Sequence, residues 1–399
     1  MARGSQLATV ELADDRLDRG PWVYGRRVRA PAEEIEPGAL VEVVDASLRF
    51  IGHALYNPHS DIRLRWLSRG RKTDLAQPER FLLGRLKAAD DLRRRALRLP
   101  EVTDAYRIVH AEGDDLPGLV VDRLGSVIVC EHHALGFWQL KDDVSRALLQ
   151  LYPGFEIVHR VPNSVFGSEG FSDAERAAAE TSGEFSREVE ITEHGMVYPL
   201  VPGRGHKTGF FCDQRENRRR FGELARDRRV YDLCCNTGGF GLHAKRGGAR
   251  YVLAVDLDEV VLERAHAAAA RNGLELDFAH ADAFPALRGL IDSGRRAELI
   301  NLDPPKLAAG RARLDDALKK YHDLNALALA ALEPGGLLMT FSCSGALDLS
   351  GFLGVVFSAA RRAGREIRLL DVLGPGADHP QRPDHPRSRY LKGALVAAD

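Results

Sequence analysis

The sequence predicts an α/β protein whose last part is a doubly wound, mostly parallel sheet, preceded by a small all-β module and a central α+β domain. From about residue 188, apolar strand-like runs alternate with amphipathic helical stretches, which is typical of a parallel sheet with helices on both faces. Residues 8–70 instead carry short apolar runs broken by Gly and Pro, which favour strands. Hairpin and helical patterns are mixed between these two parts.

A chain of 399 residues is long enough for two or three domains. We predict the all-β module at 1–72, the central α+β domain at 73–187 and the doubly wound sheet at 188–399. The first range contains the strand-like runs GALVEVVD and SDIRLRWLS. The second opens with a charged helical stretch near 73–98 and continues with hairpins around EGDDLPG. Further helices are expected near 137–152 and 172–182.

Strands and helices alternate through the last range. The strand-like runs are RVYDLCC, YVLAVD, LELDFAH, ELINLD and LLMTFSC. The helices expected after them span 240–247, 258–272, 285–293, 315–332 and 348–363. Because the carboxyl ends of parallel strands share one edge of a sheet, ligands bind there, near the point where strand order reverses.

Composition limits the class of protein. Hydrophobic residues make up 44% and charged residues 28% of the chain, as in ordinary globular proteins. No apolar run approaches the roughly 18 residues of a membrane helix, and the N-terminus lacks the apolar core of a secretory signal. The five cysteines include no CxxC pair, so neither a disulfide framework nor a zinc site is indicated. We expect a reduced, cytoplasmic protein without a metal.

Charge is unevenly distributed, although the formal net charge is −1. The stretch 61–98 holds twelve Arg or Lys against five Asp or Glu, and 204–229 and 361–392 are also rich in basic residues. Each stretch alone is compatible with a solvated helix face. Three such stretches on a neutral chain favour a basic surface for RNA or DNA.

A glycine-rich loop follows the first strand of the predicted sheet. Adjacent glycines let the backbone turn tightly and approach a ligand closely. The loop consists of Asn236, Thr237, Gly238, Gly239, Phe240 and Gly241. Its spacing is not the G-x-G-x-x-G of a dinucleotide-binding loop, so an oxidoreductase is disfavoured.

Acidic residues follow the next two strands. Asp256 can accept hydrogen bonds from both hydroxyls of a ribose, and Asp282 with Ala283 can meet the edge of an adenine. With the glycine loop, these acids predict a site for S-adenosylmethionine, because its cationic end needs carboxylates or a polar loop rather than an anion cradle. The alternative is that Asp256 and Asp258 merely cap the following helix.

The fourth and fifth strands end in residues that can carry chemistry. Asp303 is followed by Pro304, Pro305 and Lys306, and the two prolines hold the backbone extended and rigid. In enzymes that methylate exocyclic amines, a similar acid-Pro-Pro motif ends in an aromatic residue that stacks on the target base. Because Lys306 occupies that position here, methylation of an exocyclic amine is disfavoured. Cys343, at the end of the next strand, is expected to face the same pocket.

A thiolate at this position has a specific use. Carbon 5 of a cytosine is a poor nucleophile, but thiolate addition to carbon 6 makes it able to attack a sulfonium methyl, which is covalent catalysis. Asp303 would hydrogen-bond the edge of the cytosine ring. A cationic neighbour such as Lys306 would lower the pKa of the thiol.

The alternative for Cys343 is a buried, inert cysteine, which is the common state of cysteines that form no disulfide. Its position opposite the acid-Pro-Pro motif favours the catalytic interpretation. Cys234 and Cys235 are expected to pack within the first strand, and Cys130 and Cys212 to be structural.

Several motifs together make the chain resemble one family, the bacterial ribosomal RNA large subunit methyltransferase I type. Members of this family are cytosine-5 methyltransferases with an N-terminal PUA domain. The matching stretches are KTGFFCDQRENR (207–218), NTGGFG, LDPPK, FSCSG, ADHP (377–380) and YLKG (390–393). The stretch from GALVEVVD to RLRWLS is similar to the PUA part, so the resemblance covers nearly the whole chain.

The resemblance implies a class I, Rossmann-like S-adenosylmethionine methyltransferase sheet, S-adenosylmethionine as the donor and 23S ribosomal RNA as the substrate class. It makes Cys343 the covalent nucleophile and Asp303 the acid that holds the pyrimidine, and it puts Asp213, Gln214 and Arg215 near the cofactor or pocket. A homodimer is plausible by the same likeness. We expect RNA contacts from a final group of residues: Arg63, Arg65, Lys207, Pro304, Pro305 and Lys306.

The predicted function is therefore formation of 5-methylcytosine in 23S RNA, preferably in naked or partly assembled form. Two alternatives stay open. The same scaffold could methylate guanine or adenine, or the chain could be a non-catalytic RNA-binding assembly factor.

Overall fold

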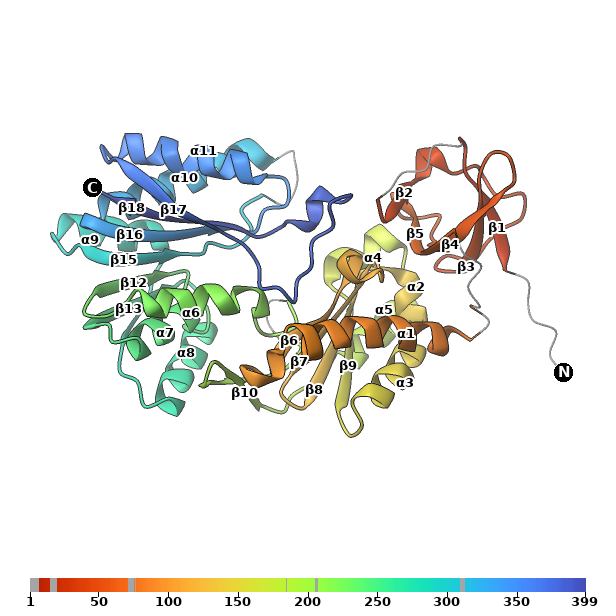
Figure 1. Cartoon of the computed structure of the whole chain (residues 1–399), viewed down its shortest axis with the longest axis horizontal. Helices are drawn as coiled ribbons and strands as arrows, with labels where there is room; N and C mark the ends of the chain where they lie inside the picture. The colour runs from red at the N-terminus through yellow and green to blue at the C-terminus, as the bar shows by residue number, and fades with distance from the viewer. Residues whose placement is uncertain are drawn as a thin grey trace. The chain divides into compact units, whose positions relative to one another are not determined.

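The computed structural model describes residues 7–14, 20–70, 75, 77–183, 185–204, 207–308 and 313–399. They form two compact units, each discontinuous in sequence (Figure 1). The first unit runs to Ile191 and also contains Leu200–Phe211 and Ala377–Ser388. The second consists of Thr192–Pro199, Cys212–Gly376 and Arg389–Asp399. The sequential ranges 1–72, 73–187 and 188–399 stay a prediction.

A five-stranded sheet begins the first unit. Its strands are β1 (Ala8–Glu11), β2 (Trp22–Tyr24), β3 (Leu40–Val44), β4 (Phe50–Tyr56) and β5 (Ile62–Arg69), in the order β1-β3-β4-β5-β2. β1 and β3 are parallel, and the other pairs are antiparallel. Alternate residues such as Val41, Val43 and Leu64 face a small core, as expected for strands with one buried face.

A four-stranded sheet with helices forms the rest of the first unit. Its strands are β6 (Ala105–His110), β7 (Leu119–Leu124), β8 (Val127–His132) and β9 (Glu156–Arg160), in sequential order. The helices are α1 (Pro78–Asp91), α2 (Leu135–Gln139), α3 (Lys141–Leu151), α4 (Asn163–Glu169) and α5 (Asp173–Ser182). Pro78 stands at the first turn of α1, where proline is well tolerated. The helix expected from 73 therefore starts later, and residues 73, 74 and 76 lie outside the described part of the chain.

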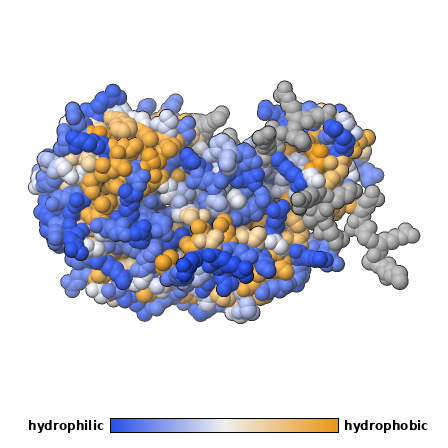
Figure 2. Space-filling view, in the orientation of Figure 1, coloured by the Kyte–Doolittle hydropathy of each residue, from blue (hydrophilic) through white to orange (hydrophobic). Residues whose placement is uncertain are grey.

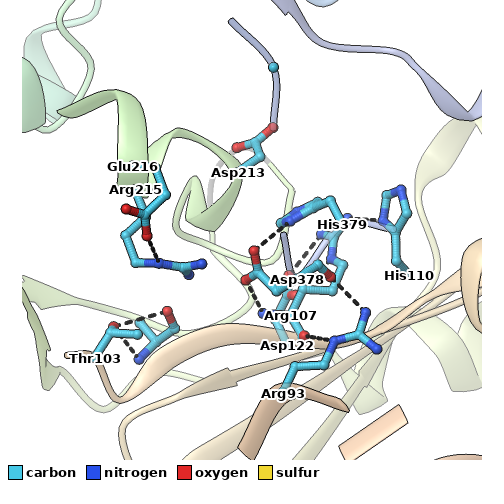
Figure 3. Close-up of polar contacts among 12 residues, drawn as sticks. Arg93, Thr103, Arg107, His110, Asp122, Asp213, Arg215, Glu216, Asp378 and His379 are labelled. Atoms are coloured by element: carbon cyan, nitrogen blue, oxygen red, sulfur yellow. Dashed lines mark hydrogen bonds and ion pairs between the residues drawn. The ribbon is translucent and has the colours of Figure 1, made fainter. Parts of the chain in front are cut away.

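Buried hydrogen bonds attach the late segment Ala377–Ser388 to this sheet. Asp378 accepts a hydrogen bond from the backbone N–H of Arg107 at 3.0 Å, and its carbonyl accepts one from Arg93 at 2.7 Å. Arg107 in turn forms a two-point pair with Asp122, at 2.8 and 2.9 Å (Figure 3). The sequence motif ADHP thus contributes an anchor within the first unit.

The second unit contains a seven-stranded sheet in the order β14-β13-β12-β15-β16-β18-β17. Its strands are β12 (Arg229–Leu233), β13 (Tyr251–Asp256), β14 (Asp277–His280), β15 (Ala297–Leu302), β16 (Leu332–Ser342), β17 (Ile367–Leu373) and β18 (Lys392–Ala398). The helices are α6 (Arg215–Glu223), α7 (Gly239–Arg246), α8 (Glu259–Arg271), α9 (Ala283–Asp292), α10 (Leu314–Ala330) and α11 (Leu349–Arg362). A hairpin of β10 (Val189–Glu193) and β11 (Met196–Leu200) precedes them.

Strand order reverses at β12, which lies between β13 and β15, both parallel to it. The predicted strand–helix alternation is observed from β12 to α11. Two features differ from expectation. β17 and β18 are antiparallel additions that the alternation does not predict. β12 ends at Leu233, because Cys234 has φ +58°, a left-handed conformation that a strand cannot continue through, so Cys234 and Cys235 lie after the strand.

The outer strand β17 leaves apolar side chains in contact with solvent. Leu369, Leu370 and Val372 are exposed, as is Phe357 of α11. Figure 2 shows a hydrophobic area on this part of the second unit.

None of the described helices is both long and apolar enough to cross a membrane.

We predict that Glu169→Ala destabilises the first unit by about 3–5 kcal/mol, because it leaves the buried guanidinium of Arg65 without its carboxylate. Glu169 accepts hydrogen bonds from Arg65 at 2.8 Å, Ser60 at 2.7 Å and Asn57 at 3.1 Å. The measurement is the free energy of unfolding from urea denaturation.

The control is Glu180→Ala, which removes the exposed pair with Arg176 and should cost less than about 1 kcal/mol. A similarly small loss for Glu169→Ala would show that the buried pair does not hold the unit together.

Candidate active site

The loop after β12 is built from left-handed turns. Cys234, Asn236 and Gly238 have φ of +58°, +49° and +75°. The loop is fixed by hydrogen bonds from Cys235 N to Val255 O at 3.0 Å and from Gly238 N to Cys235 O at 2.9 Å. At Gly239 a Cβ would lie 2.5 Å from Cδ of Arg218, so a larger residue would require that side chain to move. Gly238 is therefore needed for the left-handed turn, and Gly239 for the close approach of the Arg218 side chain.

Two carboxylates hold the loop in place by accepting hydrogen bonds from its backbone. Asp232, fully buried at the end of β12, accepts hydrogen bonds from Gly241 N at 2.7 Å and Asn301 Nδ2 at 2.8 Å. Burial raises the pKa of Asp232 to about 6 despite these donors. Asp256 accepts from Asn236 N at 2.8 Å, so it orients the loop at the neighbouring strand end.

Helix capping accounts for two of the other acids. Asp258 accepts from Val260 N at 2.9 Å and is the N-cap of α8. Asp282 accepts from Phe284 N at 2.7 Å and is the N-cap of α9. The capping alternative is therefore correct for Asp258, and it also applies to Asp282, whereas Asp256 bonds to the glycine loop and to the backbone of Asp258.

The acids that follow different strands gather around Cys234. Burial raises the pKa of the Cys234 thiol, and a set of nearby carboxylates raises it further: Asp256, Asp303, Asp232 and Asp282. Asp256 bonds to the loop after β12 and Asp303 bonds to the end of that strand, so at least two carboxylates lie at the carboxyl edge of the sheet. Such a site suits a ligand that carries positive charge.

Asp303, directly after β15, is held at the same edge. Its backbone N–H donates to Leu233 O at 3.3 Å, and its carboxylate accepts from Gln214 Nε2 at 2.9 Å. Gln214 is itself oriented by Asn217 Nδ2, 2.6 Å from its Oε1. Beyond Asp303, Pro304 is buried while Pro305 and Lys306 are exposed.

The residues before α6 lie against the C-terminal part of the second unit. The carboxylate of Asp213 accepts from Tyr390 OH at 2.5 Å, and its carbonyl accepts from Gly376 N at 2.9 Å. Arg215 is fully buried and bonds to Glu216 at 3.1 Å (Figure 3). Asp213 thus fixes two distant parts of the chain next to the Gln214–Asp303 pair.

Cys343 follows β16 and is held between two serines with structural contacts. Ser342 Oγ accepts from Ser344 N at 3.3 Å. Ser344 Oγ accepts from Ala308 N at 3.1 Å and lies 3.0 Å from Tyr321 OH. Both serines are fully buried, whereas Cys343 is partly exposed. The hydroxyls therefore fix the backbone on either side of the thiol, and the bond to Ala308 ties this segment to the Asp303 loop.

Some predicted site residues have other contacts. The ring of Phe240 packs in the core, 5.6 Å from Phe221 and 5.8 Å from Phe341 between ring centroids, so its side chain does not face the loop. Arg65 is buried in its pair with Glu169, which corrects the expectation that it contacts RNA. Arg63 and Lys207 belong to the first unit and are half-buried, and Lys207 lies over the ring of Phe211 at 4.5 Å.

Much of the basic stretch 61–98 is neutralised locally. Among the described residues of this stretch, the ion pairs include Arg65–Glu169, Arg85–Asp115, Arg93–Asp114, Arg94–Asp90, Arg95–Asp91 and Arg98–Glu101. Asp90 and Asp91 are already among the five acids counted in this stretch, but the other acidic partners lie outside it. The sequence count therefore overstates the positive charge that this stretch presents to a polyanion. Among the described residues, no group of three or more His, Cys, Asp or Glu side chains could hold a metal ion.

Three residues near Cys343 were not singled out from the sequence: Tyr321, Tyr390 and Lys392. Tyr321 comes from α10, Lys392 is the first residue of β18, and Tyr390 lies two residues before that strand. The motif YLKG contains two of them, but only the pairing of β18 with β16 brings them to the site.

Comparison with known proteins identifies the family. The S-adenosylmethionine-dependent methyltransferase model matches residues 171–377, and the PUA-like domain model matches 12–69. A protein of Tolumonas auensis named ribosomal RNA large subunit methyltransferase I is 38% identical over 98% of this chain and 99% of its own. Namesakes from Aeromonas hydrophila and Photobacterium profundum are 36% and 35% identical, over 96% and 94% of both chains. The chain belongs to this family.

Solved structures share the fold of this methyltransferase family. One, assigned as a methyltransferase and solved with SAH, superposes with a TM-score of 0.80 at 20% identity, covering 98% of this chain and 99% of its own. A second, from Streptococcus mutans and assigned as an S-adenosylmethionine-dependent methyltransferase, gives a TM-score of 0.79 at 20% identity, covering 98% of this chain and 100% of its own. The expected combination of a PUA-like domain with an S-adenosylmethionine methyltransferase sheet is confirmed.

The site fits the cofactor of a methyltransferase. S-adenosylmethionine carries a sulfonium and an ammonium group, and the carboxyl edge of the sheet gathers four carboxylates around a backbone loop of left-handed turns. The loop after β12, with Asp256 and Asp303 bonded beside it, lies at the strand-order reversal, where ligands of open α/β sheets bind.

We predict that Asp232→Asn flattens the pH dependence of stability between pH 4 and 7. The pKa of Asp232 is raised to about 6 in the folded protein, so the stability it contributes is present below its ordinary pKa near 4 and is lost as the pH rises through 6. Relative to the variant, the native protein should lose about 3 kcal/mol of unfolding free energy across this range.

Urea denaturation at several pH values provides the measurement. Asp232→Ala is the matched control: it also lacks the titration, but it leaves the N–H groups of Gly241 and Asn301 without an acceptor and should be less stable at every pH. Parallel curves for the native protein and Asp232→Asn would contradict the raised pKa.

Proposed function

We propose that this protein methylates carbon 5 of a cytosine in 23S ribosomal RNA and that Cys343 forms a covalent bond to the base. The observation that carries the proposal is the meeting of two strand ends. Asp303 follows β15, Cys343 follows the adjacent parallel strand β16, and the bond from Ala308 N to Ser344 Oγ joins their loops. One edge of the sheet thus carries both an acid that can hold a pyrimidine, Asp303, and a sulfur nucleophile, Cys343.

The donor would bind around the glycine loop. We assign Asn236, Thr237, Gly238 and Gly239 to backbone contacts, Asp256 to the ribose hydroxyls, and Asp282 with Ala283 to the adenine. Phe240 can contribute only through its backbone, since its ring is in the core. Arg215 and Gln214 support the site from α6 and the turn before it. When bound, S-adenosylmethionine supplies a methyl group on a sulfonium, which an electron-rich carbon can take.

The cysteine makes carbon 5 electron-rich. The Cys343 thiolate adds to carbon 6, a C–S bond forms, and the electron pair of the 5,6 double bond moves to carbon 5. Asp303, oriented by Gln214, hydrogen-bonds the ring edge and favours protonation of the ring nitrogen. After carbon 5 has gained the methyl group, a base, such as a water molecule, removes its proton. The double bond then re-forms and the thiolate leaves.

The substrate class follows from the named relatives and the PUA-like domain. A base inside a helix must be turned out of its stack, which costs a few kcal/mol and least in unpaired RNA. Naked or partly assembled 23S RNA is therefore the proposed form. Arg63, Lys207, Pro304, Pro305 and Lys306 stay candidates for RNA contacts. A cytoplasmic location and a homodimer also stay predictions.

We predict that Cys343→Ala abolishes formation of 5-methylcytosine, lowering the rate at least about 10³-fold, because the change removes the sulfur that forms the covalent bond. The assay incubates purified protein with bare 23S RNA and labelled S-adenosylmethionine. Mass spectrometry of the digested nucleosides then identifies the methylated base. Cys130→Ala, a change in the core of the first unit, is the matched control and should retain activity.

Each outcome tests a separate part of the proposal. Undiminished 5-methylcytosine with Cys343→Ala would exclude the covalent mechanism. Methylguanine or methyladenine as the product would replace the cytosine assignment with the alternative reaction. Cofactor binding without transfer to any ribosomal RNA would favour a non-catalytic RNA-binding factor.

A further inference from the structure

Lys392 is a buried lysine next to the proposed nucleophile. It is the first residue of β18 and pairs with Ser342, the residue before Cys343, in the antiparallel ladder with β16. Only 1% of Lys392 is exposed. Its ammonium donates to Ser344 O at 2.6 Å and to Tyr390 O at 2.8 Å. Through Ser344 and the pairing with Ser342, Lys392 contacts both neighbours of the cysteine.

The charges that face Lys392 come from three elements. Burial lowers its pKa to about 8, Cys343 and Asp348 act to raise it, and Lys306 acts to lower it further. Asp348 is exposed and serves as the N-cap of α11, accepting from Gly351 N at 2.7 Å. Water screens the charge of the exposed Asp348. Cys343 is only partly exposed, so its thiolate would be the negative charge near Lys392 that water screens less.

A purely structural role does not require a charge here. Two carbonyl acceptors can be satisfied by a neutral donor, whereas removing an ammonium from water is costly unless an anion lies nearby. An ammonium has three N–H donors, and the two carbonyls use two of them. A thiolate beside Lys392 would offset the cost of burying it, and the ammonium would lower the pKa of the thiol in return.

We propose that Lys392 is a positioning residue for Cys343: it fixes the backbone around the cysteine and stabilises its thiolate. This inference rests on the proposed function, in which Cys343 is the nucleophile. It changes one expectation from the sequence, where Lys306 was the cation considered for this role. Lys306 is exposed on the Asp303 loop, where water screens its charge, while Lys392 is buried on the strand paired with β16.

The test measures the ionisation of Cys343 directly. Full-length protein without RNA or cofactor is alkylated with iodoacetamide between pH 5 and 10, and mass spectrometry of the Cys343 peptide gives the rate at each pH. Because the thiolate is the reacting form, the midpoint of the profile reports its pKa. The native protein should show a midpoint below the ordinary value of about 8.5.

Variants separate charge from hydrogen bonding. Lys392→Gln keeps a donor for the carbonyls but loses the charge, and it should raise the midpoint by about one pH unit or more. Lys392→Arg keeps the charge and should retain a low midpoint. Lys306→Met, the matched control for loss of a nearby lysine, should shift the midpoint little. Thermal melting of each variant checks that the second unit is folded.

The native protein alone can overturn the inference: a midpoint at or above about 8.5 would do so. The inference would also be overturned if the native protein and Lys392→Gln had the same midpoint, or if Lys392→Arg raised the midpoint as much as Lys392→Gln does.

The alkylation result is independent of methylation. A shifted midpoint together with active Cys343→Ala would leave the role of Lys392 in the ionisation of Cys343 standing and remove the covalent mechanism. An unshifted midpoint together with inactive Cys343→Ala would do the reverse.

Discussion

One constraint underlies the site: the carboxyl ends of β12, β13 and β15, with β16 beside them, all meet at one edge of a parallel sheet. Residues that are far apart in sequence become neighbours there because each follows its own strand. Asp256 bonds to the loop after β12, and Asp303 bonds to the end of that strand. The raised pKa of the Cys234 thiol, to which burial and carboxylates at the ends of three of these strands contribute, is an electrostatic result of this convergence.

Like charges at one edge repel one another, and a cationic ligand offsets that repulsion. The protein holds the arrangement by hydrogen bonds to fixed donors. Asn301 and Gly241 bond to Asp232, Gln214 bonds to Asp303, and the backbone of Asn236 bonds to Asp256. The site is thus preorganised by neutral donors, which leaves its net negative charge available to a sulfonium.

Strand-end reasoning predicted much of this edge because it needs only the order of strands and helices. Asp256, Asp303 and Cys343 follow from that order alone. Lys392 does not, because β18 runs antiparallel, so its first residue rather than its last reaches the carboxyl edge. Contacts made by side chains were also beyond the sequence. Nothing in it reveals that Glu169 takes Arg65 into the interior or that the ring of Phe240 joins an aromatic core.

The central claim is that the sulfur of Cys343 bonds to carbon 6 of a cytosine. An RNA substrate with 5-fluorocytosine at the target tests it most directly, because fluorine blocks the loss of a proton from carbon 5 that would release the enzyme. In the presence of S-adenosylmethionine, the account predicts a protein–RNA adduct that survives denaturation and maps to the peptide containing Cys343. Methylation of ordinary RNA with no such adduct, or an adduct at another residue, would contradict it.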